Sequence, residues 1–433
     1  MLIRQGFQYA LRLKPLREAV LQRWVGCRRF VFNEGLAHQR AEMVEGRKRP
    51  GYTALCARLP ALKAERLWLC EPPAQALQQA LKDLCKAWDS RYTSRFGTPR
   101  FKKRGEGDTL RMPQDCRYDA AAGTLHLPKL GAVRLRHSRE ALGTLKNVTL
   151  RREGSRWVAS LQTEREIEVS PSAATAAVGL DFGAATTIMP SAGAPIELPP
   201  RIGRYERRMK RLTQAVSRKK KGSANRKKAA SRLGRCHRRL AAIRRDFLNK
   251  ATTGLVRAHA IIAVEDLKVK SMTASAAGTV EAPGTRVAQK RGLNRMILRN
   301  GWGIARVMLE YKAAWVGAAL VAVPPAYTSQ ECWACGHIAA QSRKTQAMFV
   351  CVACGHADSA DRNAAKVILR RGQQILSGGR PTSTAGYAET HACEGGWRKP
   401  PRPRPRSAAP ARPVGLAVAG TTPGAERSGN LHP

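Results

Sequence analysis

The chain has 433 residues, of which 43% are hydrophobic, and this is enough for two or three domains that each bury a core. Its 77 Lys and Arg residues outnumber 31 Asp and Glu residues, and the resulting net charge of +46 indicates a polyanionic partner, most simply a nucleic acid. No apolar stretch approaches the roughly 20 residues of a membrane span, and the N-terminus lacks the apolar segment of a secretory signal. We therefore expect no membrane attachment and a cytoplasmic, nucleoid-associated protein.

The N-terminal part predicts a helical region flanked by β-structure. Residues 7–13 alternate as a strand does, and residues 16–43 and 73–88 carry apolar side chains at helical spacing. Short alternating segments between residues 125 and 161, with Gly154 at a hairpin turn, read as further strands. We expect a small β-barrel or sandwich that reuses the N-terminal strand.

Two buried strands farther along each end in an acidic residue. Residues 176–183 form an apolar run that reaches Asp181 and then a glycine, and residues 260–267 form a second run that reaches Glu265. A third strand is predicted at residues 318–323. If these strands are neighbours in one sheet, their ends bring the two acids to the same edge.

The segment between the first two of these strands, residues 201–245, is very basic and reads as two long helices joined at Gly222. A helix face that is merely solvated normally mixes both signs of charge, and this segment has almost no acids. We therefore expect it to contact nucleic acid. The residues expected to do so are Arg207, Arg208, Lys210, Arg211, Lys219, Lys220, Arg226 and Lys227.

Four cysteines near the C-terminus form a C-x2-C…C-x2-C array, with a glycine after each second cysteine to permit a sharp turn. Two such knuckles supply a tetrahedral set of thiolates, which favours a closed, structural zinc ribbon over reduced cysteines buried by chance. The other seven of the eleven cysteines are scattered, which fits a reducing compartment. The four predicted zinc ligands are Cys332, Cys335, Cys351 and Cys354.

A third acid, Asp361, follows the cysteine array directly. Phosphodiester hydrolysis by a pair of Mg²⁺ ions needs hard oxygen ligands of this kind. Taken singly, each acid has a simpler explanation: Asp181 as a turn former, Glu265 as part of a helix cap, and Asp361 as the N-cap of a helix at residues 364–369. The set of three, in a basic chain, predicts a nuclease.

These segments, in this order, closely resemble the TnpB family of transposon-encoded, RNA-guided DNA endonucleases, which are related to the type V CRISPR effectors. The similarity covers most of residues 1–370. The motifs that carry it are Gly179-Leu180-Asp181-Phe182-Gly183, Val264-Glu265-Asp266-Leu267, Tyr327-Thr328-Ser329-Gln330-Glu331-Cys332, the four cysteines and Ala360-Asp361-Arg362-Asn363-Ala364-Ala365.

The resemblance implies an α/β multidomain protein in which a split RNase H-like RuvC nuclease domain contains an inserted zinc ribbon, and an N-terminal wedge β-barrel contains an inserted helical recognition lobe. It makes Asp181, Glu265 and Asp361 the Mg²⁺-binding catalytic triad. The implied boundaries are 1–15 and 98–170 for the wedge, 16–97 for the helical lobe, 176–330 and 358–372 for the nuclease, 331–357 for the ribbon and 373–433 for a disordered tail.

The resemblance also implies the partners: a guide RNA, and double-stranded target DNA cut beside a short recognised motif. By similarity, Tyr52 and Gln78 contact that motif, although Tyr52 is equally compatible with a core position. Three other functions remain open: a nuclease-inactive RNA-guided DNA binder or repressor, a transposase acting directly in strand transfer, and a zinc-ribbon RNA-binding protein of structural class. Residues 272–291 read either as a mobile lid or as a disordered connector.

Overall fold

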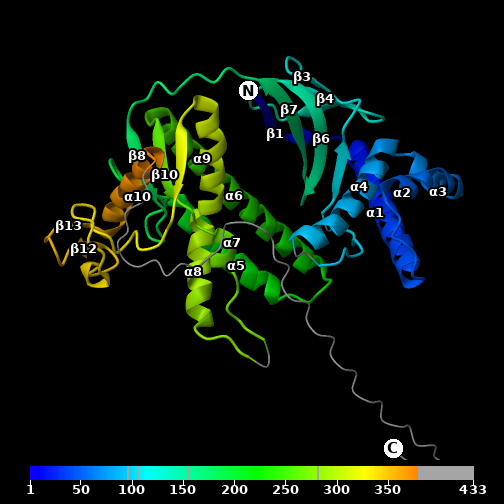
Figure 1. Cartoon of the computed structure of the whole chain (residues 1–433). Helices are drawn as coiled ribbons and strands as arrows, with labels where there is room; N and C mark the ends of the chain where they lie inside the picture. The colour runs from blue at the N-terminus through cyan, green and yellow to red at the C-terminus, as the bar shows by residue number, and fades with distance from the viewer. Residues whose placement is uncertain (95–96, 106, 155, 280–281, 379–433) are drawn as a thin grey trace, which may run out of the picture. The chain divides into compact units, whose positions relative to one another are not determined.

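The computed structural model describes residues 1–94, 97–105, 107–154, 156–279 and 282–378 (Figure 1). None of the helices in these ranges combines the length and the apolar character needed to cross a membrane. The predicted tail lies outside the described residues from position 379 onward.

The N-terminal part contains a seven-stranded sheet in the order β2-β6-β7-β1-β5-β4-β3. β1 lies between β7 and β5, so the predicted reuse of the N-terminal strand is confirmed. The short strands β2 and β3 were not predicted. The strands are β1 (Leu2–Arg12), β2 (Thr109–Met112), β3 (Arg117–Asp119), β4 (Thr124–Leu127), β5 (Gly131–Leu135), β6 (Thr144–Glu153) and β7 (Arg156–Glu166).

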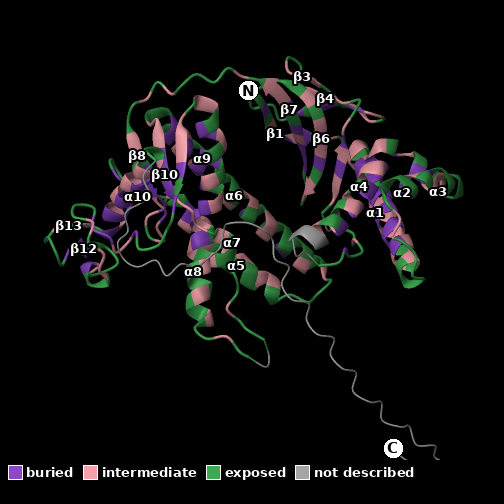
Figure 2. Ribbon diagram, viewed as in Figure 1, coloured by how far each residue is buried: buried purple, intermediate pink, exposed green. Residues whose placement is uncertain are grey.

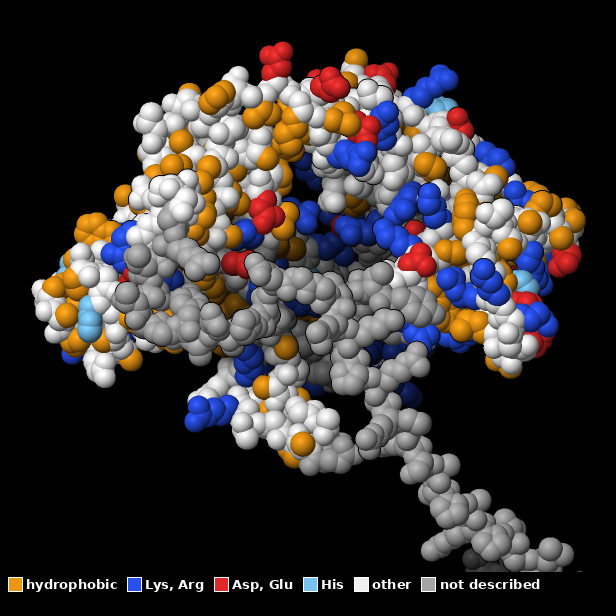
Figure 3. All heavy atoms as spheres, in the orientation of Figure 1, with side chains coloured by type: hydrophobic (Ala, Val, Ile, Leu, Met, Phe, Trp, Pro, Cys, Tyr) orange, Lys and Arg blue, Asp and Glu red, His pale blue; other side chains and the backbone are white. Residues whose placement is uncertain are grey.

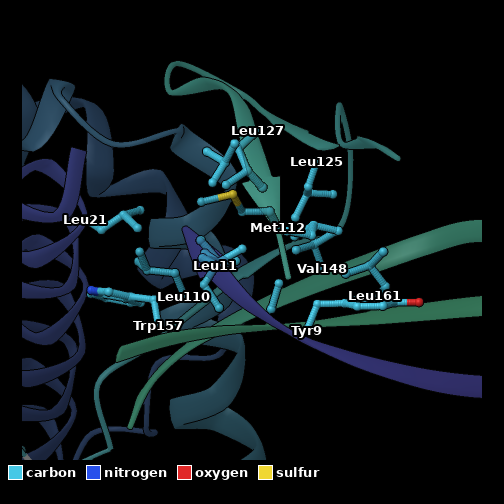
Figure 4. Packing of buried hydrophobic residues seen from close by; sticks show 14 of the residues in the cluster. Tyr9, Leu11, Leu21, Leu110, Met112, Leu125, Leu127, Val148, Trp157 and Leu161 are labelled. Atoms are coloured by element: carbon cyan, nitrogen blue, oxygen red, sulfur yellow. The ribbon is translucent and has the colours of Figure 1, made fainter. Parts of the chain in front are cut away.

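One face of this sheet is closed by a core of large apolar side chains (Figure 4). Tyr9, Met112 and Trp157 are at most 2% exposed, and Leu21 of the following helix packs into the same cluster. Burying each such side chain contributes about 1.5–3 kcal/mol, so this cluster fixes the sheet register.

A helical region follows β1. The two predicted helices are present, and Trp88 of the second donates a buried hydrogen bond to Gln39 of the first (2.9 Å). The elements are α1 (Pro15–Val44), α2 (Tyr52–Ala57), α3 (Leu59–Glu65), η1 (Leu67–Cys70) and α4 (Ala74–Ser94).

The third region is built on a four-stranded sheet in the order β11-β10-β8-β9. The three predicted strands are present as β8, β10 and β11, which run parallel, and their apolar centres are buried (Figure 2). Because parallel strands end at the same edge, the residues that follow them are brought together. The strands are β8 (Ala177–Asp181), β9 (Met189–Pro190), β10 (Ile261–Glu265) and β11 (Ala319–Val323).

Helices surround this sheet: α9 packs on β11, and α10 crosses β8, β10 and β11 (Figure 1). The predicted pair of basic helices is confirmed as α5 and α6, which are joined through Gly222. The remaining elements are α5 (Arg201–Ser217), α6 (Ala224–Ala258), α7 (Val269–Met272), α8 (Val287–Asn300), α9 (Trp302–Val316), η2 (Ala340–Ser342), β12 (Met348–Val350), β13 (Ala357–Ser359) and α10 (Ala360–Leu376).

Three boundaries differ from the predictions. α8 begins at Val287, so the end of the 272–291 segment is helical and is neither a mobile lid nor a disordered connector. Residues 280–281 of that segment lie outside the described residues. α10 continues to Leu376, so residues 373–376 are helical and not part of a tail. α10 also begins at Ala360, with Ser359 at its N-cap, so Asp361 lies in the first turn and is not the cap.

Candidate active site and metal centre

Asp181 and Glu265 are the last residues of two neighbouring parallel strands, β8 and β10. The residues just before them pair across the sheet, with Leu180 opposite Val264. Both acids therefore lie at the carboxyl edge of the sheet, and both side chains are only partly accessible.

The third acid is carried to this edge by an unusually close approach of helix to strand. A methyl group on Gly179 of β8 would lie 2.0 Å from the carbonyl oxygen of Ala365 on α10, so only a glycine fits there. Asp361 lies about one helical turn before Ala365. Its Oδ2 atom is 3.4 Å from the point where a Cβ on Gly183 would stand, just beyond the end of β8.

The negative charges of Glu265 and Asp361 both act on the carboxyl group of Asp181. Burial, reinforced by the negative charges of Glu265 and Asp361, raises the pKa of Asp181 to about 7. Burial also raises the pKa of Glu265 and the pKa of Asp361. The site therefore disfavours three ionised carboxylates unless a cation is bound with them.

Neighbouring side chains hold the acids in place. The Thr328 hydroxyl donates to Oε1 of Glu265 (2.5 Å), and the Arg306 guanidinium donates to the Glu265 carbonyl oxygen (3.2 Å). Asn300 donates to the carbonyl oxygens of Gly183 (2.9 Å) and Ala184 (3.0 Å) in the loop after Asp181.

The sequence analysis assigned no role to Thr328, Arg306 or Asn300. Thr328 belongs to the Tyr327–Cys332 motif of the family resemblance, and that motif is the only sequence signal for its role. The other two have no local signature, because their contacts reach across the fold.

A cationic side chain from the cysteine-rich segment also reaches the acids. Arg343 places a guanidinium nitrogen 3.9 Å from Oδ1 of Asp361, and its charge opposes the rise in the pKa of both Asp361 and Asp181. Arg343 thus adds a positive charge to the acidic edge, defined as Asp181, Glu265 and Asp361 at the carboxyl edge of the sheet.

The donor set of the acidic edge suits Mg²⁺, which prefers carboxylate oxygens. Among the described residues, the four cysteines are the group of three or more potential ligands whose atoms all lie within 4.8 Å of one another. The three carboxylates are spread more widely than that, which is compatible with ligands shared between two ions about 3.5–4 Å apart.

The four cysteines form a separate centre whose geometry fits zinc. The Sγ atoms of Cys332 and Cys354 are 3.7 Å apart, and those of Cys335 and Cys351 are 3.6 Å apart. Four thiolates about 2.3 Å from a tetrahedral zinc ion would be about 3.8 Å from one another. The predicted turns are also present, because the glycines after each second cysteine have positive φ angles (+77° and +73°).

Most of the basic residues predicted to contact nucleic acid are exposed along α5, α6 and their connection. Lys and Arg side chains also outnumber acidic ones on the visible face of the molecule (Figure 3). Arg226 is different, because its guanidinium donates to the carbonyl oxygens of Val216 (2.7 Å) and Lys219 (3.0 Å) and so closes the turn between the helices.

The two residues expected to contact a DNA motif lie in the helical region. Tyr52 is the first residue of α2 and is 37% exposed, so it is not a core aromatic. Gln78 is half-buried on α4. The structure does not bring either of them into the acidic edge of the four-stranded sheet.

Three family models match the chain: a "Helix-turn-helix domain" over residues 1–48, a "Probable transposase" over residues 160–276 and a "Cas12f1-like, TNB domain" over residues 302–368. The first of these ranges contains a strand and one long helix, β1 and α1. The other two contain all three acids and all four cysteines.

Two relatives are similar over most of their length. The "Putative RNA-guided DNA endonuclease InsQ" of Escherichia coli (strain K12) is 42% identical over 377 residues, covering 87% of this chain and 94% of the relative. The "Putative RNA-guided DNA endonuclease" of Streptomyces pristinaespiralis is 33% identical over 379 residues, covering 86% of this chain and 90% of the relative.

A solved structure shares the fold. The Cas12f1 chain in a complex with sgRNA and target DNA aligns with a TM-score of 0.51 and 11% sequence identity, covering 84% of this chain and 98% of that chain. At this identity the likeness concerns the fold alone.

Proposed function

Because the chain belongs to the TnpB family of RNA-guided DNA endonucleases, we propose that it cleaves double-stranded DNA at sites chosen by a guide RNA. The observation that carries the proposal is the gathering of Asp181, Glu265 and Asp361 at one edge of the sheet, where the pKa of Asp181 rises to about 7. All three positions are acidic, which argues against a nuclease-inactive relative.

In this proposal the three carboxylates hold Mg²⁺ and align the scissile phosphate. Bound Mg²⁺ would lower the pKa of the attacking water and offset the charge on the leaving oxygen. β8 and β10 supply two rigid ligands, and α10 supplies the third through its close packing on Gly179. Thr328 and Arg306 fix the side chain and the backbone of Glu265.

The finer domain assignment is part of the same proposal. The four-stranded sheet and its helices would be the RuvC-like nuclease, the cysteine segment a structural zinc ribbon, the seven-stranded sheet the wedge and α1–α4 the recognition lobe. The protein would act in the cytoplasm, where its DNA substrate lies.

The exposed basic residues of α5 and α6 would bind the phosphates of the guide RNA. Base pairing between the guide and the target strand would then select the DNA sequence. Tyr52 and Gln78 would contact the duplex motif beside the target, since both side chains can hydrogen-bond a base edge. Arg226 would contribute by shaping the turn between the basic helices.

The test is cleavage of a target plasmid by the purified protein with guide RNA and Mg²⁺. Asp181→Asn should reduce cleavage by about a thousandfold or more, because several kcal/mol of charge stabilisation is lost, while guide-dependent DNA binding is retained. Asp266→Asn is the matched control, because Asp266 directly follows Glu265 but is paired with Lys268 (2.6 Å) and has a side chain that is 47% exposed. It should cut normally.

Other outcomes of this test would contradict the proposed function. Binding without cutting by the unmodified protein would mean an RNA-guided DNA binder. Products joined to target ends would mean direct strand transfer. Undiminished DNA cleavage by Asp181→Asn would show that the acidic edge does not take part in the reaction.

A further inference from the structure

A short hydrogen bond joins Glu265 to Thr328, which lies between β11 and the first cysteine knuckle. Thr328 is 3% exposed, and its Oγ1 lies 2.5 Å from Oε1 of Glu265 and 3.1 Å from the carbonyl oxygen of Pro325. A hydroxyl carries one proton, and the shorter contact to a carboxylate is the stronger hydrogen bond. Thr328 thus fixes one oxygen of Glu265 and leaves Oε2 for other partners.

The turn that carries Thr328 is clamped from both sides by one arginine of α10. Arg371 donates to the carbonyl oxygens of Pro324 (3.1 Å) and Ala326 (2.8 Å), before Thr328, and to Oε2 of Glu331 (2.9 Å), after it. The side chains of Arg371 and Glu331 are each only 4% exposed. A buried ion pair with this many hydrogen bonds is costly to rearrange, so the turn has one geometry.

The backbone of this turn is also strained. Tyr327 has a φ angle of +61°, a left-handed conformation that costs a non-glycine residue about 1 kcal/mol or more. The carbonyl oxygen of Tyr327 accepts hydrogen bonds from the amides of Gln330 (2.9 Å) and Glu331 (3.0 Å). The side chain of the next residue, Thr328, meets Glu265.

The same helix is tied to the first cysteine knuckle. Asn363 donates to the carbonyl oxygen of Glu331 (2.7 Å) and accepts from the backbone amide of Trp333 (3.0 Å), and these residues flank Cys332. Arg370 donates to the carbonyl oxygen of Trp333 (2.7 Å). Asn363 is fully buried and lies two residues after Asp361.

We propose that Thr328 is a positioning residue for Glu265, held in register by the Arg371–Glu331 clamp, and that this clamp makes the Mg²⁺ affinity of the acidic edge depend on the turn leading into the cysteine knuckle. The inference rests on the proposed function, because it gives Glu265 the role of a metal ligand. Partners that orient a metal ligand typically change metal affinity by about 10- to 100-fold when they are removed.

The experiment compares Thr328→Val, which removes the hydroxyl at nearly constant volume, with Thr328→Ser, which keeps it. Mn²⁺ binding to the protein–guide RNA complex is measured by electron paramagnetic resonance, and cleavage is measured as a function of Mg²⁺ concentration. For Thr328→Val, the Mn²⁺ dissociation constant and the Mg²⁺ midpoint should each rise about tenfold. Thr328→Ser should restore both to within about threefold of the unmodified protein, and the cysteine-bound zinc should be unchanged in both variants.

The outcomes separate this inference from the proposed function. A complex that binds Mn²⁺ but cuts no DNA would contradict the proposed function. The Mn²⁺ affinity of Thr328→Val would still test whether Thr328 positions Glu265. Equal Mn²⁺ affinity in Thr328→Val would overturn the positioning role. An equal loss of Mn²⁺ affinity and thermal stability in both variants would also overturn it, because the turn would then be purely structural.

Discussion

Gly179 on β8 and Ala365 on α10 touch backbone to backbone: a Cβ on the glycine would lie 2.0 Å from the alanine carbonyl oxygen and 2.6 Å from the amide nitrogen of Leu369. Neither obstacle is the mobile end of a side chain. The contact sets the depth at which α10 lies on the sheet, and with it the position of Asp361.

Gly179→Ala should therefore destabilise the protein by about 1–3 kcal/mol or more, because the helix must move off the strand. Chemical denaturation of the purified protein measures the loss. Gly254→Ala in α6 is the control, because nothing lies within 4 Å of its Cβ position. It should be neutral or stabilise by up to about 1 kcal/mol. Equal stability of the two variants would show that α10 can shift freely.

The raised pKa of Asp181 predicts a pH dependence of metal binding. The pKa of this group is about 7 in the folded protein and 3.8 without the fold, so the metal-free folded state retains a proton that the unfolded chain loses. Its contribution to the free energy of unfolding is thus favourable below about pH 4 and is lost as the pH rises toward 7. Since Mg²⁺ needs the ionised carboxylate, binding should release a proton near pH 6 and almost none near pH 8.5.

Calorimetry in buffers of different ionisation enthalpy measures this proton release. Asp181→Asn should abolish it, and its metal-free melting temperature should fall less than that of the unmodified protein between pH 5 and pH 8. A proton release that is the same at pH 6 and pH 8.5 would contradict the assignment.

The sulfur geometry predicts one zinc ion per chain. Cys335→Ser should lower the bound zinc, measured by elemental analysis, and reduce the melting temperature by roughly 10 °C, because metal binding and folding are coupled. Cys70→Ser is the control, since Cys70 is exposed and free. A variant that is zinc-free but fully stable would show that the ribbon folds without metal.

The basic helices predict a salt-dependent affinity for guide RNA. Replacing four exposed residues by Gln should reduce the slope of log affinity against log salt by about 3, at roughly 0.7–0.9 per phosphate contact. The residues are Arg211, Lys219, Lys220 and Lys227. Lys48, Lys63, Lys82 and Lys86 of the helical region provide the same charge change as a control. An equal effect of both sets would mean that only net charge matters.

The strands that carry the acids were predictable because β8 and β10 are short apolar runs that end in a carboxylate, and buried parallel strands have this pattern. The cysteine spacing likewise predicted the grouping of sulfur atoms. Both signals are local in the sequence.

What the sequence could not indicate is the set of contacts made by folding. The motif around Thr328 gave no reason to pair its hydroxyl with Glu265, 63 residues away, or to pair Glu331 with Arg371. α8 was missed because its sequence is polar and follows a run of small residues, and it packs through few side chains such as Ile297. Asp361 resembles an N-cap, but Ser359 at the end of β13 takes that position, and an acid in the first turn is favourable for the helix dipole.

The order in which the chain supplies its acids has a consequence for its synthesis. The basic helices precede α10 by more than a hundred positions, and Asp361 arrives with the last described helix. Under the proposed function, a nascent chain on the ribosome would therefore expose the basic helices, which are proposed to bind guide RNA, before it could complete the acidic edge. Binding of the guide RNA would then precede the ability to cleave DNA.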